Sequence, residues 1–163
     1  MAVDLTLAKQ HLKVETTDED ALITQYLNAA NAWVENYTGK LLTRREVTQE
    51  QACFDAYLPI YFGPDPASLT IAYTDADDAA QTIADALIVR DRVYPADTWP
   101  TAADNTAVTL TYTAGFESVP ADLDSAVLLL VGDSYANRET SEAAPAVSMA
   151  VEALCRPYRS LRV

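Results

Sequence analysis

The chain has 163 residues, 50% of them hydrophobic, with a mean hydropathy of −0.04 and a net charge of −13. These values are typical of one folded domain with a buried core, and they exclude an intrinsically disordered chain. The densest apolar run, residues 126–131, is far shorter than the roughly 20 residues of a membrane span, and the N-terminus lacks the pattern of a secretion signal. We therefore expect a cytoplasmic product without membrane association, in which Cys53 and Cys155 stay reduced.

Acidic and basic residues are distributed unevenly along the chain. Residues 46–133 contain fifteen acidic side chains but only two basic ones, whereas three arginines and no acid follow Glu152. The sequence thus predicts an acidic body with a basic tail. Because such a body repels nucleic acid, we expect that DNA can lie near the protein without being bound specifically.

Two helices are predicted in the N-terminal part. Thr6 is a candidate N-cap for a short helix over residues 7–12. A longer helix over 18–38 follows, with the Thr17 hydroxyl and the Asp20 carboxylate at the spacing of a capping box.

Apolar residues of the longer helix recur every three to four positions in two adjacent rows, which predicts that it is heavily buried. One row is Leu22, Tyr26, Ala29, Trp33 and Tyr37, whose three aromatic residues are expected to lie in the core. The other is Ile23, Leu27, Ala30 and Val34. Gly39 is expected to end the helix, because glycine adopts the left-handed conformation without strain.

The middle of the chain loses helical periodicity and gains the alternating pattern of strands. The predicted strands cover residues 45–54, 68–73, 81–83, 87–93 and 107–113, with a turn at 74–78 and a loop at 95–105. Together they predict a small antiparallel sheet or barrel-like element.

A long helix is predicted over residues 120–138, with Pro120 suited to its first turn, followed by a polar hinge and a short helix over 146–155. The fold class is therefore α+β and mainly α: a helix bundle with an inserted small antiparallel β element at about residues 41–116. We expect residues 1–145 to form a single domain and residues 146–163 to form a C-terminal docking arm.

Residues suited to catalysis or metal binding are scarce. The single histidine, His11, has no partner that the sequence can assign, and the four glycines form no phosphate-binding loop. Asp75, Asp77 and Asp78 lack the glycine and closing glutamate of a calcium loop, so they favour a solvated turn. We therefore expect no enzyme activity, no cofactor and no metal.

Aromatic residues beside proline or arginine are better candidates for protein contacts. Trp99 lies in a loop next to Pro100, and Tyr158 lies between Arg156 and Arg159. Aromatic residues and arginine are enriched at protein interfaces.

Three groups of residues, near the start, before residue 120 and near the end, form one wider pattern. They are Leu7 to Val14 with Asp18 to Ile23 and Tyr37 to Lys40; Val108 to Phe116 with Val119 and Pro120; and Asp122 to Val131 with Tyr135 to Glu139 and Leu154 to Arg159. This pattern resembles the head–tail connector (adaptor) proteins of the DNA-packaging type, which occur in tailed bacteriophages, prophages and gene transfer agents. The resemblance spans nearly the whole chain but is poor between about residues 48 and 105.

The resemblance implies a structural protein of the virion neck that is made in the host bacterial cytoplasm. It implies a ring, dodecameric in the family, that lies beneath the portal protein, extends the DNA channel and offers an attachment surface to the tail or to stopper (head-completion) proteins. DNA passes through such a channel without specific binding. The candidate residues for contact with the portal or a neighbouring subunit are Arg138, Glu139, Arg156, Tyr158, Arg159, Arg162 and Trp99.

Two other functions stay open. An acidic regulatory or DNA-mimic protein that binds a nucleic-acid enzyme would explain the charge, but not the basic tail. A metal-dependent hydrolase would need Asp75 or Asp77 as a ligand, which the sequence supports weakly.

Overall fold

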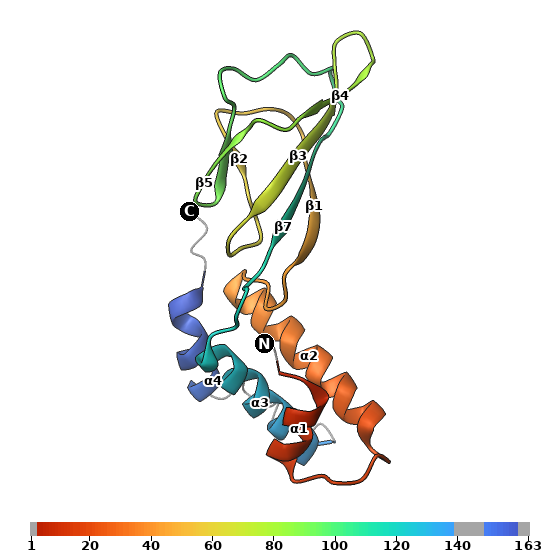
Figure 1. Cartoon of the computed structure of the whole chain (residues 1–163), viewed down its shortest axis with the longest axis vertical. Coiled ribbons are helices and arrows are strands. Elements are labelled where there is room, and N and C mark those ends of the chain that lie inside the picture. Colours follow the sequence, from red (N-terminus) through yellow and green to blue (C-terminus); the bar gives the residue numbers. More distant parts are fainter. Residues whose placement is uncertain (1–2, 139–148, 160–163) are drawn as a thin grey trace. The chain divides into compact units, whose positions relative to one another are not determined.

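The computed structural model describes residues 3–138 and 149–159. The chain divides into two compact parts, a helical unit of residues 1–43 and 117–163 and a β unit of residues 44–116. Figure 1 shows the helices of the first and the sheets of the second. The predicted insertion of a β element between helices is confirmed.

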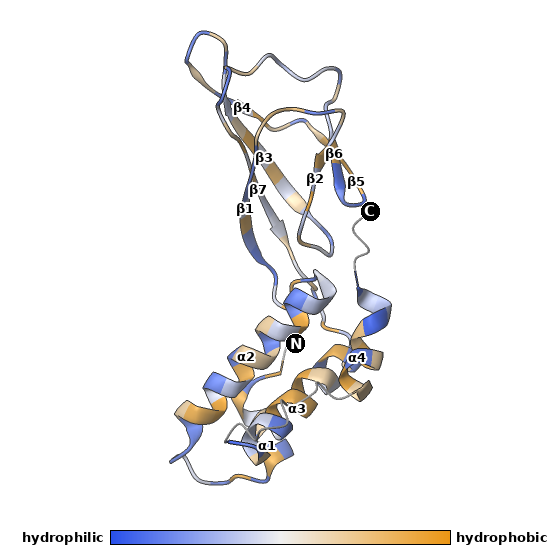
Figure 2. Ribbon diagram, turned by 180° about the vertical axis from the view of Figure 1, so that it is seen from behind, coloured by the Kyte–Doolittle hydropathy of each residue, from blue (hydrophilic) through white to orange (hydrophobic). Residues whose placement is uncertain are grey.

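The helical unit is organised around its third helix. Its elements are α1 (Leu5–Leu12), α2 (Asp20–Thr38), α3 (Ala121–Ala136), α4 (Met149–Cys155) and the 3₁₀ turn η1 (Arg156–Tyr158). Helix α3 contacts the other three α-helices and is rich in hydrophobic residues (Figure 2). Its buried side chains are Leu123, Ala126, Val127 and Val131. The prediction of a buried core helix at this position is thus confirmed, with Pro120 as its N-cap.

The starts of the first two helices differ from the predictions. Helix α1 begins at Leu5, because the Asp4 carboxylate accepts a hydrogen bond of 2.8 Å from the Leu7 amide, and Thr6 lies inside the helix. Helix α2 begins at Asp20 without a side-chain cap. The predicted capping box does not form, because Asp20 pairs instead with Lys9 of α1.

The two apolar rows of α2 are not equally buried. Its fully buried residues are Ile23, Leu27, Ala30, Val34 and Thr38. The row with Tyr26, Trp33 and Tyr37 is only half-buried, so the prediction that these aromatic residues are core was wrong. Only one face of α2 packs on other helices. The predicted end at Gly39 is confirmed by its φ of 69°.

The β unit contains two antiparallel sheets within the described residues. The four-stranded sheet has the order β1-β7-β3-β4, and the three-stranded sheet has the order β2-β6-β5. The strands are β1 (Arg45–Gln51), β2 (Leu58–Pro59), β3 (Ala67–Thr74), β4 (Ala80–Ile83), β5 (Leu87–Val89), β6 (Arg92–Tyr94) and β7 (Val108–Ala114). The β3–β4 hairpin was predicted. The strand expected over 87–93 is instead a tight hairpin of β5 and β6, in which Arg90 adopts a φ of 60°.

A buried polar cluster joins β1, β7 and the segment after β2. The Tyr112 hydroxyl donates a hydrogen bond of 2.9 Å to Gln49 Oε1, and Gln49 Nε2 donates one of 2.6 Å to the Pro59 carbonyl. The Tyr61 amide also donates to Gln49 Oε1, at 3.2 Å. Burial raises the pKa of the Tyr112 phenol, because it disfavours the ionised form. Gln49 is thus a core residue in a strand that appears polar in sequence.

The observed fold is α+β, as predicted, with more β structure than the mainly helical expectation. Helix α4 lies in the segment expected to form the C-terminal docking arm, residues 146–163. Helix α4 buries Val151 and Cys155 within the helical unit and packs on α3. The docking role of residues 146–163 stays a prediction.

A close contact between α1 and α3 gives a testable stability effect. A Cβ atom added at Gly132 would lie 3.2 Å from Nε2 of His11, the far end of an exposed side chain that can move. Because glycine disfavours a helix interior by about 1 kcal/mol relative to alanine, Gly132→Ala is expected to stabilise the helical unit by up to about 1 kcal/mol. Urea unfolding measures the change, and Gly132→Ala with His11→Ala is the control. A destabilised Gly132→Ala that His11→Ala rescues would mean that His11 cannot move.

Candidate interaction surfaces

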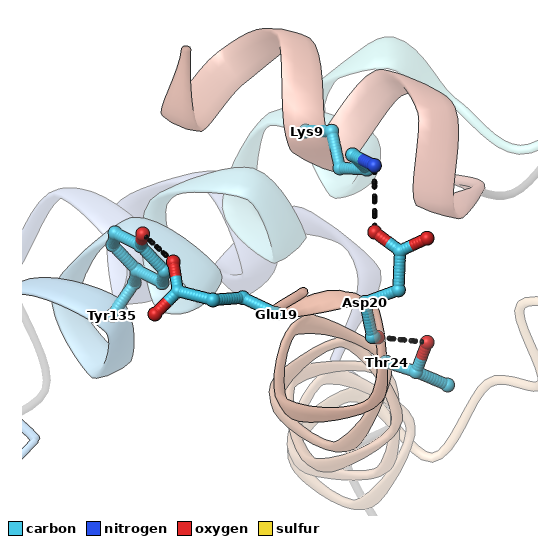
Figure 3. Close-up of polar contacts among 5 residues, drawn as sticks. All are labelled: Lys9, Glu19, Asp20, Thr24 and Tyr135. Atoms are coloured by element: carbon cyan, nitrogen blue, oxygen red, sulfur yellow. Dashed lines mark hydrogen bonds and ion pairs between the residues drawn. The ribbon is translucent and has the colours of Figure 1, made fainter. Parts of the chain in front are cut away.

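Arg138 lies at the end of α3 and is joined to the start of α2. Its Nη2 is 2.6 Å from Oε1 of Glu19, and its guanidinium lies 4.6 Å from the ring centroid of Tyr135. The Tyr135 hydroxyl donates a hydrogen bond to the other Glu19 carboxylate oxygen (Figure 3). The Arg138 side chain remains 46% exposed, so it can also contact a partner. Glu139, its predicted companion, lies outside the described residues.

A second ion pair fixes α1 on α2. Lys9 Nζ lies 2.6 Å from Asp20 Oδ1, and the Thr24 hydroxyl donates a hydrogen bond of 2.7 Å to the Asp20 carbonyl (Figure 3). Glu19 and Asp20 of the acidic cluster at residues 18–20 therefore orient helices. The sequence could not reveal this role, because both partners, Lys9 and Arg138, are distant in sequence from the acids they pair with.

Acid is expected to weaken the contact of Glu19, at the start of α2, with Tyr135 and Arg138 at the end of α3. The hydrogen bonds from Tyr135 and Arg138 hold the pKa of Glu19 below its ordinary value of 4.5. A lowered folded-state pKa contributes stability above pH 4.5, and this contribution is lost as the pH falls through the folded-state pKa. Glu19→Gln should therefore lower the urea midpoint at neutral pH, and the difference from the wild type should shrink in acid. An equal difference at both pH values would contradict the prediction, and Glu15→Gln is the matched control.

Residues of the C-terminal segment gather beside α2 and α3. The Tyr158 hydroxyl lies 3.4 Å from Oδ2 of Asp122, and burial together with this carboxylate raises the pKa of Tyr158. The Arg159 guanidinium lies 5.4 Å from the ring centroid of Tyr37, whose ring stacks on Trp33 at 4.9 Å. These contacts place an aromatic and basic surface on the helical unit.

The structure thus brings Tyr158 and Arg159 together with aromatic residues of α2 that the sequence had assigned to the core. Arg156 is exposed on η1. Arg162 lies outside the described residues. Arg138 belongs to a different cluster from Tyr158 and Arg159, so the predicted interface residues do not form one site.

Trp99 packs inside the β unit. Its ring stacks on Phe54 with centroids 4.9 Å apart, and Phe54 meets Tyr73 edge-on at 5.3 Å. The indole Nε1 is buried and has no hydrogen-bond partner within the described part of the chain. A cavity of about 240 Å³, lined by residues 52–54, 100 and 102–106, lies next to this stack. Trp99 therefore packs within the β unit, and its indole N–H makes no hydrogen bond to the described residues.

The outward side of the three-stranded sheet is a surface that the sequence did not reveal. Strand pairing places Leu87 opposite Tyr94 and Val89 opposite Arg92, while Val93 on the other side is fully buried. The Arg92 guanidinium also lies 4.3 Å from the ring centroid of Tyr57. We call this set the outer face: Tyr57, Leu87, Val89, Arg92 and Tyr94. The sequence signal for this surface was the alternation of side chains around Ile88. A single strand over 87–93 would have placed Val93 on the same side as Leu87 and Val89, whereas the hairpin places it on the other side.

The acidic turn after β3 is structural. The carboxylate of Asp75 accepts hydrogen bonds from the amides of Asp77 and Ala79, at 3.0 and 2.9 Å, and from Gln81 Nε2 at 2.8 Å. The Ala79 amide and these other donors hold the pKa of Asp75 below its usual value. Within residues 3–138 and 149–159, no three His, Cys, Asp or Glu side chains gather as a metal site would require. None of the described helices is both long and apolar enough for a bilayer crossing.

Together, the fold and these surfaces define an α+β protein in which a helical unit carries an inserted β unit and both present residues suited to protein contacts. The sequence profile of the family described as "HCP: Head completion protein" matches residues 3–148. The chain therefore belongs to the head completion protein family. This match confirms the predicted relationship to head–tail connector proteins of phage-like particles.

Solved structures support this relationship over nearly the whole chain. A chain from the neck of an empty GTA particle, computed with C6 symmetry, is 27% identical, with a TM-score of 0.83 over 99% of this chain and 91% of that chain. A chain from the neck of a native GTA particle, computed with C12 symmetry, is 26% identical, with a TM-score of 0.77 over 100% and 94% of the two chains. A third, from the virion of a native gene transfer agent, is 26% identical, with a TM-score of 0.81 over 99% and 91%. No curated protein matches significantly.

Proposed function

We propose that this protein is a structural connector subunit in the neck of a phage-like particle. In this role it forms a ring beneath the portal, extends the DNA channel and provides the attachment surface for the tail or stopper proteins. The observation that carries the proposal is the full-length similarity to neck chains of particles computed with C6 and C12 symmetry. A twelve-fold ring fits both symmetries.

The charge of the chain suits a channel through which DNA moves. The β unit contains eleven acidic and four basic residues, so its net charge is −7. We propose that part of this charge faces the channel, where repulsion acts over about 8–10 Å at moderate salt. DNA would then pass without being held. A ring structure with a neutral or basic lumen would contradict this arrangement.

The proposed contacts with the portal or a neighbouring subunit use the arginine-bearing ends of the helical unit. The candidates are Arg138, Glu139, Arg156, Tyr158, Arg159 and Arg162, with Trp99 of the β unit as a separate contact. Exposure of the side chains supports these contacts. Arg156 and Arg159 are exposed, and Arg138 is half-exposed despite its pairing with Glu19.

Negative-stain imaging of the full chain mixed with the portal protein of the same particle tests the proposal. The expected result is a second ring stacked on the portal ring. Arg156→Glu should reduce stacking, whereas Lys13→Glu, the same charge change at another exposed position, should not. A chain that stays monomeric or dimeric beside the portal and binds a nucleic-acid enzyme instead would favour the DNA-mimic function.

A further inference from the structure

Strand β5 has an apolar side that is left uncovered within its own β unit. Leu87 and Val89 are 56% and 54% exposed, which is high for large aliphatic side chains in a strand. They lie two residues apart and therefore on the same side of the sheet, next to Tyr94 and Arg92 of β6. Clusters of this composition are typical of protein interfaces.

The backbone of β5 is available on one side as well. β5 is the last strand of the order β2-β6-β5, so only its β6 side is paired within the sheet (Figure 2). An open edge strand is a template for the addition of an extended segment. Backbone hydrogen bonds then supply affinity, and alternate side chains supply specificity.

The last residues of this sequence alternate polar and apolar side chains, which suits an added strand with one apolar side. Residues 159–163 read Arg-Ser-Leu-Arg-Val, so Leu161 and Val163 would share one side of an extended segment. Four residues span about 13 Å as a strand, enough to cover the three residues of β5. Arg162 would point to the other side at the open edge, where a long side chain reaches solvent.

The net charges of the C-terminal segment and the β unit are of opposite sign. The segment after Glu152 carries three arginines and no acid, whereas the β unit has a net charge of −7. Asp85 and Asp91 lie close to the two ends of β5 in sequence. The net charge of the β unit therefore favours encounter with an arginine-rich segment. Beside β5 itself, Arg90 and Arg92 offset Asp85 and Asp91, so the register depends on the apolar side chains.

We propose that the C-terminal residues 160–163 of one copy add as a fourth, antiparallel strand to β5 of a neighbouring copy, with Leu161 beside Val89 and Val163 beside Leu87. The inference rests on the proposed ring, because head-to-tail contacts of this kind close into rings when each copy donates one segment and accepts one. The arm thereby links subunits of one ring.

Disulfide trapping in the full chain tests this pairing. In a Cys53→Ser background, which removes the exposed native thiol, Val89→Cys and Leu161→Cys are made as separate variants. Strand neighbours lie within disulfide reach. Mixing the two under mild oxidation should convert most monomer into a heterodimer, whereas each alone should not. The double variant should form a ladder of linked chains.

Thr82→Cys mixed with Leu161→Cys is the matched control, since Thr82 is exposed on β4, the edge strand of the other sheet. It should leave the monomer intact. An intramolecular disulfide in the double variant would show that each arm binds its own β unit and would overturn the proposal. Absence of any link between copies would also overturn it, whether the reduced chain runs as a monomer or as a ring. A reduced chain that stacks on the portal but gives no link would leave the connector function standing.

Discussion

Replacing Gln49 with leucine is expected to lower the free energy of unfolding of the β unit by about 2–4 kcal/mol. Gln49 accepts hydrogen bonds from the Tyr112 hydroxyl and the Tyr61 amide, and it donates one to the Pro59 carbonyl. Leucine fills a similar volume but leaves the buried Tyr112 hydroxyl without this acceptor. Urea unfolding followed by circular dichroism in the β region measures the loss.

The control is Thr48→Val, a neighbouring change on an exposed position of the same strand, which should stay within about 0.5 kcal/mol of the wild type. Tyr112→Phe keeps the ring and removes only the hydroxyl, so it should cost less than Gln49→Leu. If Gln49→Leu were as stable as Thr48→Val, the polar cluster would not support the β unit.

Truncation of Leu123 in α3 is the second large effect. Leu123 is fully buried in the helix that contacts all the other α-helices of its unit. Leu123→Ala is therefore expected to destabilise the helical unit by about 3–5 kcal/mol, from lost burial and from the cavity that remains. Loss of helical signal in urea unfolding is the measurement.

Leu129→Ala makes the same chemical change on the same helix, where the side chain is 41% exposed. It should cost less than about 1 kcal/mol, because little apolar surface is returned to water. Similar losses for both variants would mean that α3 is not the centre of the helical core. If Leu129→Ala instead impaired ring stacking at normal stability, Leu129 would belong to an interface.

The structure changes how the charge asymmetry is understood. Four of the fifteen acids between residues 46 and 133 belong to the helical unit, and the other eleven belong to the β unit. Asp122 and Asp124 lie in the first turn of α3, where a negative charge is favourable to the helix dipole. Asp122 also meets Tyr158. Part of the acidity therefore serves the fold, and the β unit is the better candidate for a surface that repels DNA.

Several features were predictable from the sequence because they depend on local rules. The α3 helix, the Gly39 end of α2 and the β3–β4 hairpin follow from residue periodicity and turn chemistry within a few positions. The family relationship was also visible, because its residues lie mostly in these helices and in β7.

The remaining features depend on contacts between residues distant in sequence, which no local pattern encodes. The Asp20 carboxylate leaves the predicted capping box because packing brings Lys9 to it, and packing likewise brings Arg138 to Glu19. Gln49 is buried only because β7 and the Pro59 segment enclose it. The sequence alone determined most of the segments that form helices and strands, with β2 and the division of residues 87–93 into β5 and β6 as exceptions. The tertiary structure decided which of their faces are covered, and therefore which residues are left for partners.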